Sequence, residues 1–220
     1  MKKAESASKQ HFRVNENLFL VHEDDRRVTS HNGEEELVQV VKEGALDVEL
    51  NTWAPQIPYA VNVTRRYYAP LLVLAIKSEL LRLSAALIEQ GADVELAAVP
   101  GCPKVFKPAE YPTPIKYAIS MLSAELTTSF HREPALESSL KMTHLLIGCG
   151  VDVNRLSGGR PPLLYAVGRP RVIEALLDAG ADPFQVSEDG FTALDEAAGR
   201  ADPESYEILR RAMGHHDGLG

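Results

Sequence analysis

The sequence is poor in cysteine and has no long apolar run. Cys102 and Cys149 are its two cysteines and lie far apart, so neither a disulfide framework nor a Cys-based metal site is expected. The longest near-continuous apolar run, 69–76, is much shorter than the roughly 20 residues of a membrane-spanning helix. The positively charged first residues are not followed by the apolar segment of a signal peptide. These features predict a cytoplasmic protein with no membrane partner.

Positive charge and aromatic side chains are also scarce. The sequence contains 23 Lys and Arg and 31 Asp and Glu, which gives a formal net charge of −8. Because an acidic chain is repelled by nucleic-acid phosphates, nucleic acid is not the expected partner. Aromatics make up 6% of the residues against 45% for all apolar residues, so the expected core is aliphatic.

Motifs of enzymatic chemistry are absent from the sequence. There is no nucleophile elbow, phosphate loop or zinc-binding helix motif. Gly158-Gly159 lacks the strand, Lys and Ser/Thr of a phosphate loop and favours a tight turn. His22-Glu23-Asp24-Asp25 resembles a metal cluster, but neighbours on an extended segment point in opposite directions, so an acidic turn is expected. We therefore expect no catalytic residue, metal or cofactor.

A repeated pattern is the most informative feature that is present. Three segments have nearly the same residues, namely LIEQGADVE at 87–95, LIGCGVDVN at 146–154 and LLDAGADPF at 176–184. Each ends a stretch with helical apolar periodicity. The Gly predicts a left-handed helix C-cap, and the Asp that follows favours a turn.

A second pattern recurs before these segments. It reads APLLVLA at 69–75, TPIKYAI at 113–119, PPLLYAV at 161–167 and TALDEAA at 192–198. Thr favours an N-cap, Pro suits the first helical turn, and the small Ala allows close helix packing.

The segment GADPFQVSEDGFTALDEAA at 180–198 resembles the ankyrin repeat, in a divergent form with about four to five repeats and two insertions. The resemblance implies an all-α helical repeat solenoid with β-hairpin-like fingers. The slot that holds a His in the family is occupied by Leu72, Lys116, Leu164 and Asp195, which predicts a less regular stack.

The expected organisation follows from these patterns. Residues 1–33 are expected to be an N-terminal extension or cap, with a short strand pair or irregular structure within 11–30 and disorder at 1–9, and 34–213 are the repeat domain. The domain comprises a degenerate first repeat at 34–52, repeats at about 68–97, 111–154 and 160–184, and a C-terminal capping repeat at 190–213. Residues 214–220 are expected to be a disordered tail.

The resemblance also implies where a partner would bind, namely the concave face formed by the fingers and the first helix of each repeat. Transferred to this chain, the finger and helix positions are Arg65, Arg66, Tyr68, Lys77, Glu110, Tyr111, Met121, Ser157, Arg160, Arg169, Glu188, Asp189, Phe191 and Arg200.

Tyr and Arg are prominent in this set and supply much of the binding energy at protein interfaces. The hypothesis is a non-catalytic interaction protein, an adaptor, assembly subunit or inhibitor, that binds a protein with an acidic or extended segment and is otherwise monomeric. The alternatives are an enzyme with a site in the insertions at 96–112 or 120–139, and a self-associating structural repeat.

Overall fold

The part of the chain that the structure describes is a stack of helices with two small strand pairs. The computed structural model describes residues 12–14, 20–22, 33–43, 67–68, 71–97, 99–100, 112–120 and 129–216. The helices are α1 (Gly33–Lys42), α2 (Leu71–Lys77), α3 (Leu81–Glu89), α4 (Pro114–Ile119), α5 (Ser129–Gly148), α6 (Pro162–Ala166), α7 (Pro170–Asp178), α8 (Ala193–Gly199) and α9 (Pro203–His216). The strands are β1 (Phe12–Val14), β2 (Leu20–His22), β3 (Tyr67–Tyr68) and β4 (Val99–Pro100).

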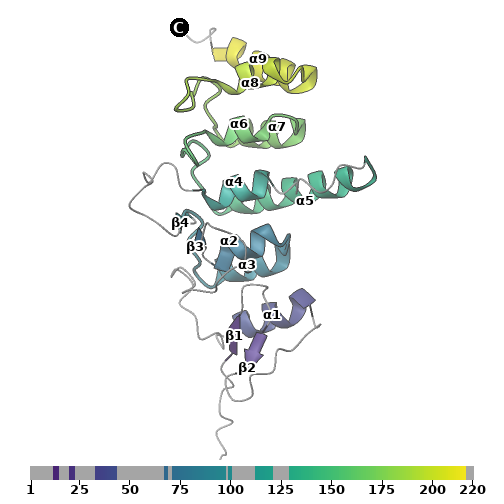
Figure 1. Cartoon of the computed structure of the whole chain (residues 1–220), viewed down its shortest axis with the longest axis vertical. Coiled ribbons are helices and arrows are strands. Elements are labelled where there is room, and N and C mark those ends of the chain that lie inside the picture. The colour runs from purple at the N-terminus through teal and green to yellow at the C-terminus, as the bar shows by residue number, and fades with distance from the viewer. Residues whose placement is uncertain are drawn as a thin grey trace, which may run out of the picture.

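Consecutive helices form pairs that stack in sequence order. Helices α2 and α3, α4 and α5, α6 and α7, and α8 and α9 pack against each other within a pair. Between pairs, α2, α4, α6 and α8 form one row, and α3, α5, α7 and α9 form a second. Figure 1 shows the resulting elongated molecule, with α1 beside α3 towards the N-terminal end. The predicted helical repeat architecture is therefore present in these pairs.

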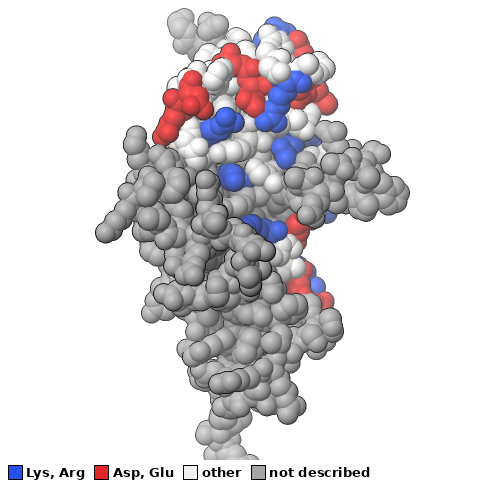
Figure 2. Space-filling model, in the orientation of Figure 1, with Lys and Arg blue, Asp and Glu red and all other residues white. Residues whose placement is uncertain are grey.

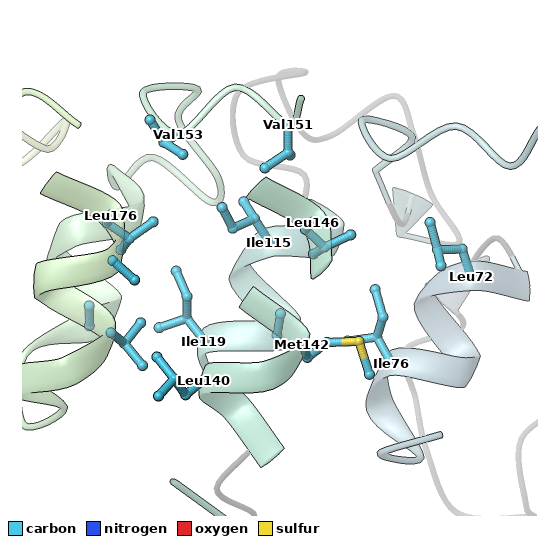
Figure 3. Packing of buried hydrophobic residues seen from close by; sticks show 14 of the residues in the cluster. Leu72, Ile76, Ile115, Ile119, Leu140, Met142, Leu146, Val151, Val153 and Leu176 are labelled. Atoms are coloured by element: carbon cyan, nitrogen blue, oxygen red, sulfur yellow. The ribbon is translucent and has the colours of Figure 1, made fainter. Parts of the chain in front are cut away.

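The apolar core runs through the stack from pair to pair. Met142 and Leu146 of α5 are fully buried, and Figure 3 shows them between the neighbouring helices near Ile76, Ile115 and Ile119. One buried cluster includes side chains from α1 through α9. A single pair cannot bury its apolar face alone, so each pair depends on its neighbours for stability.

The repeated glycines end the second helices as the sequence predicts. Gly91, Gly150 and Gly180 have φ angles of 96°, 82° and 89°, the left-handed region. The Gly180 amide donates to the Leu177 carbonyl at 2.9 Å, and the Ala181 amide donates to the Leu176 carbonyl at 2.9 Å. These two bonds form a Schellman motif.

The Asp after each glycine also adopts the expected turn. The carboxylates of Asp93, Asp152 and Asp182 each accept a hydrogen bond from the amide two residues later, at 2.8 to 2.9 Å. The three turns are thus alike in spite of the missing family His, so the expected irregularity does not extend to these turns.

Side chains also connect one turn to the next. The Asn154 Oδ1 accepts from the Asp182 amide at 2.7 Å, and the Asn154 amide group donates to the Gly180 carbonyl at 3.0 Å. In the preceding turn Glu95 accepts from the Asp152 amide. These hydrogen bonds, which a single unit could not form, fix the register of neighbouring pairs.

The helix starts agree only in part with the predicted caps. Thr192 and Asp195 form a capping box in which each side chain accepts from the other residue's amide, at 3.2 and 2.9 Å. Thr113 makes no such side-chain cap. Its amide instead donates to the Ser157 hydroxyl at 2.9 Å, in the next unit. Pro114 and Pro162 occupy the first helical turn as predicted.

The ends of the chain bring one confirmation and one correction. β1 pairs with β2 in antiparallel register, so of the two alternatives expected near the N-terminus the strand pair is present. At the other end, α9 continues through His216, so residues 214–216 are helical and do not belong to a disordered tail. The predicted domain ended at residue 213, but a glycine inside a helix costs only about 1 kcal/mol, and α9 continues through Gly214.

The insertion at 120–139 lengthens a helix. α5 has 20 residues and begins at Ser129, whereas its counterparts α3 and α7 have 9 each. Residues 121–128, and 101–111 of the other insertion, lie outside the described ranges.

Candidate partner-binding face

The row of first helices brings cations and tyrosines together. The Lys77 Nζ of α2 lies 5.6 Å from the ring centroid of Tyr117 of α4, and the Lys116 Nζ lies 4.8 Å from the same centroid. The Lys116 Nζ also lies 5.8 Å from the ring centroid of Tyr165 of α6. We call Lys77, Tyr117, Lys116 and Tyr165 the Lys–Tyr column. Its members come from three successive pairs, because α2, α4 and α6 pack side by side.

The two lysines of the column are not ion-paired with any of the described carboxylates. Lys77 is exposed and Lys116 is half-buried. Burial, and secondarily repulsion from Lys77, lowers the pKa of Lys116. The faces of Tyr117 and Tyr165 offset part of this cost through cation–π attraction. The Lys116 ammonium group is therefore incompletely hydrated, which favours its pairing with a carboxylate of a partner.

Tyr165 is held in place by its hydroxyl. It donates to the Ser157 carbonyl at 2.6 Å, and the Arg169 guanidinium donates to the Tyr165 carbonyl at 3.0 Å. Burial raises the pKa of Tyr165, and the nearby positive charge of Arg160 partly opposes that shift. Arg160, in the finger that precedes α6, is therefore close enough to Tyr165 to act on it electrostatically.

Arg160 and Arg200 differ in how closely a carboxylate neutralises their charge. The Arg160 guanidinium lies 3.9 Å from the Asp189 carboxylate, beyond hydrogen-bond distance, and its side chain is 40% exposed. Arg200 instead forms a close ion pair with Glu196 on its own helix, at 2.6 Å. Arg160 is accordingly the better placed of the two to bind an external anion.

The finger before α6 is a tight turn. Ser157 and Arg160 exchange backbone hydrogen bonds at 2.9 and 3.3 Å, and Gly158 and Gly159 between them have φ angles of 61° and 75°. Two central residues with positive φ are typical of a type I′ hairpin turn. The Glu188 amide of the next finger donates to the Gly159 carbonyl at 2.9 Å, so neighbouring fingers are joined.

The predicted contact residues fall into three groups. Exposed or half-buried on the described surface are Lys77, Arg160, Arg169, Glu188, Asp189, Phe191 and Arg200. Ser157 is fully buried and holds Thr113 and the finger together, so it is a structural residue and its assignment as a contact is wrong. Arg65, Arg66, Glu110, Tyr111 and Met121 lie outside the described residues, and Tyr68 is placed only as part of β3, which pairs with β4.

Sequence reasoning missed Lys116, Tyr117 and Tyr165 as members of the face. Their signal was in the repeated pattern, where Lys116 occupies the slot of the family His and each Tyr follows that slot. The slot alone does not show that these side chains meet, because that depends on how the helices stack.

Charge is unevenly distributed along the molecule. On the face shown in Figure 2, the described surface carries separate Lys and Arg side chains among uncharged residues, while Asp and Glu gather near the C-terminal end. Phe184, Val186 and Phe191 are exposed apolar residues of the last described finger, at 45%, 50% and 54% exposure.

The described residues form neither a metal-binding cluster nor a membrane-spanning helix. No group of three or more His, Cys, Asp and Glu there could hold a metal ion. None of the helices described is long and apolar enough to cross a membrane.

The chain shares a short stretch of similar sequence with a much longer protein. No family model matches the chain. A stretch of 72 residues is 40% identical to the E3 ubiquitin-protein ligase hecd-1 of Caenorhabditis elegans, covering 32% of this chain and 3% of that protein. The chain therefore spans a very small part of this relative.

Proposed function

We propose that the chain is an ankyrin-type repeat protein without catalytic activity, which binds another protein through its fingers and first helices. The ankyrin assignment is supported by the sequence resemblance together with the repeated Gly caps and Asp turns, which have the same geometry in three successive units. The in-order packing of helix pairs is what this repeat type requires.

The observation that carries the binding proposal is the Lys–Tyr column with Arg160 near Tyr165. In a chain of net charge −8, the described structure brings two lysines and two tyrosine rings together on the row of first helices, and Arg160, in the finger before α6, is near enough to Tyr165 to affect its pKa. Lys116 has a lowered pKa there, so the protein bears a cost to keep this cation in place. A rigid scaffold reduces the entropy lost on binding, so few such side chains give useful affinity.

Affinity purification with charge-neutralised variants tests the proposal. The triple variant Lys77→Gln, Lys116→Gln and Arg160→Gln is compared with the unchanged chain, and captured proteins are quantified by mass spectrometry. The unchanged chain is expected to retain a stoichiometric protein partner that the variant loses. Three surface changes on the second row of helices, Lys141→Gln, Arg171→Gln and Arg210→Gln, remove the same charge and serve as the matched control.

The control variant is expected to retain the partner, since its cations form exposed ion pairs with Glu137 and Glu207 away from the column. Equal retention of the partner by the column variant would refute the binding proposal. A multimer found by light scattering, with no other protein bound, would favour self-association instead.

A further inference from the structure

The large apolar side chains that are exposed in the described part of the chain all belong to one finger. They are Phe184, Val186 and Phe191, which are 45%, 50% and 54% exposed. We call residues 182–191, which lie between α7 and α8, the last finger. Single exposed apolar residues are common on protein surfaces, but several within one short segment are typical of an interaction site.

The preceding units show which side of the last finger is uncovered. Phe184 occupies the position that holds Glu95 and Asn154 in the two preceding units, four residues after the repeated glycine. In the first of these units the Glu95 carboxylate accepts from the Asp152 amide of the next turn. In the second, the Asn154 Oδ1 accepts from the Asp182 amide of the next turn. Phe184 therefore lies on the side of the finger that a following unit covers elsewhere in the stack.

The helices beside the last finger have a polar outer surface. None of the large apolar residues described in α8 and α9 is exposed, whereas the exposed residues of α9 include Glu204, Glu207, Arg210 and Arg211. A polar outer face is what the terminal unit of a repeat stack needs. Another helix pair stacked on this end would contact apolar side chains at the finger and charged ones along the helices. The last finger is therefore suited to a segment of a partner and not to a further repeat.

The backbone of the last finger is fixed by hydrogen bonds before any partner binds. The Glu188 amide donates to the Gly159 carbonyl of the preceding finger at 2.9 Å. The Ser187 amide donates to the Phe191 carbonyl at 2.9 Å, and Ser187 itself is buried. Because the loop is already ordered, a segment that covers its exposed side chains causes little further loss of entropy.

The charge of the last finger selects a basic partner. The finger contains Asp182, Glu188 and Asp189 and no Lys, Arg or His. Asp189 is 68% exposed and lies 3.9 Å from the Arg160 guanidinium, and Glu188 forms no ion pair with the described cations. Figure 2 shows Asp and Glu gathered near this end of the molecule. Carboxylates repel the phosphates of nucleic acid and anionic lipid and attract Lys and Arg, so a basic protein segment is favoured.

We infer that the last finger is the docking site for a protein segment in which apolar side chains adjoin Lys or Arg. The apolar side chains of the segment cover Phe184 and Val186, and its cations pair with Glu188 and Asp189. This inference rests on the proposed function and specifies the partner at one end of the same face. Since the Lys–Tyr column favours carboxylates, a partner that contacts both regions is basic at the last finger and acidic at the column, which fixes its direction on the stack.

Selection from a library of short random peptides tests the inference. The library is selected on the full chain and, in parallel, on the finger variant Phe184→Ser with Val186→Ser, in which two exposed apolar side chains become polar. Peptides enriched on the unchanged chain and lost on the finger variant are expected to carry Leu, Ile or aromatic residues next to Lys or Arg. The inference is overturned if no enriched peptide depends on the finger, or if those that do lack Lys and Arg.

Fluorescence anisotropy then measures the strongest finger-dependent peptide. The finger variant is expected to weaken its binding at least about tenfold, because exposed aromatic residues at an interface supply much of the affinity. Glu188→Gln with Asp189→Asn should weaken it several-fold and make binding less dependent on salt, since fewer charges pair across the interface. Circular dichroism verifies that each variant is folded.

The matched control removes the same charge elsewhere. Glu174→Gln with Glu204→Gln neutralises two exposed carboxylates on α7 and α9, and the affinity for the peptide should stay the same. An equal loss of affinity in the control would mean that the net charge of the chain, and not the finger, binds the peptide.

The outcomes separate the inference from the proposed function. If light scattering shows a multimer of the unchanged chain that dissociates in the finger variant, a second copy occupies the finger and the inference is wrong. The affinity purification with the column variant still decides on the proposed function, because Lys77, Lys116 and Arg160 are not part of the last finger. Loss of the natural partner in the column variant, with no finger-dependent peptide found, would support the proposed function and refute the inference.

Discussion

Two left-handed residues in neighbouring units should respond in opposite directions to exchanges between Gly and Ala. Gly180 ends α7 with a φ of 89°, and Ala201 follows α8 with a φ of 51°. Their hydrogen bonds match, since the Ala201 amide donates to the Ala198 carbonyl at 3.1 Å and the Asp202 amide donates to the Ala197 carbonyl at 3.0 Å. Caps of the same type are thus formed by a glycine after α7 and by an alanine after α8.

The expected change in the free energy of unfolding depends only on backbone conformation in the folded and unfolded chain. A Cβ at Gly180 would have nothing within 4 Å, so no steric clash contributes. An L-residue in the left-handed region costs about 1–2 kcal/mol. Alanine recovers about 0.5–1 kcal/mol of this through a less flexible unfolded chain. Gly180→Ala should therefore lower the free energy of unfolding by about 1 kcal/mol, and Ala201→Gly should raise it by a similar amount.

Urea unfolding followed by far-UV circular dichroism measures both effects. With a slope of about 2 kcal/mol/M, each change shifts the midpoint by about 0.5 M, downwards for Gly180→Ala and upwards for Ala201→Gly. Gly199→Ala, in α8 and with open space around the Cβ, is the control for glycine removal without a positive φ and should stabilise slightly. A lower midpoint for Ala201→Gly would refute the left-handed cap at that position.

Three further predictions concern the core, the connection between units and a helix start. Leu146→Ala should lower the free energy of unfolding by about 3–5 kcal/mol, because this fully buried side chain packs between helix pairs. Thermal unfolding measures this loss of stability, and a loss below about 1 kcal/mol would contradict the packing. Asn154→Ala should cost about 1–3 kcal/mol by urea unfolding, because it removes the side-chain hydrogen bonds to the Asp182 amide and the Gly180 carbonyl of the next turn, and a cost near zero would contradict this connection. Thr192→Ala should cost about 1 kcal/mol by urea unfolding. The hydrogen bonds from Thr192 lower the pKa of Asp195. This cap therefore stabilises the fold above the unfolded-state pKa of Asp195, and its contribution is lost as pH falls through the folded-state pKa. A destabilisation by Thr192→Ala that stays constant down to about pH 2 would argue against this ionic contribution to the cap.

Local features of the fold could be predicted because they depend on neighbours in the sequence. The left-handed caps at Gly91, Gly150 and Gly180 and the Asp turns after them depend on hydrogen bonds between residues a few positions apart. The repeated sequence segments were therefore sufficient to predict them. The tight turn at Gly158-Gly159 was predictable for the same reason.

Interactions between units could not be predicted in this way. Ser157 was expected at a contact surface, but it is buried between units, where its hydroxyl accepts from the Thr113 amide, 44 residues earlier in the chain. Thr113 was expected to cap its helix with its side chain, and it does not.

By itself, the sequence determined where helices end, which turns follow them and that the units repeat, since each of these is decided by backbone conformation and short-range hydrogen bonds. Only the tertiary structure decided which side chains share a surface. Lys77, Lys116 and Tyr165 form one column because α2, α4 and α6 pack side by side, and that packing is set by apolar burial between units far apart in the chain.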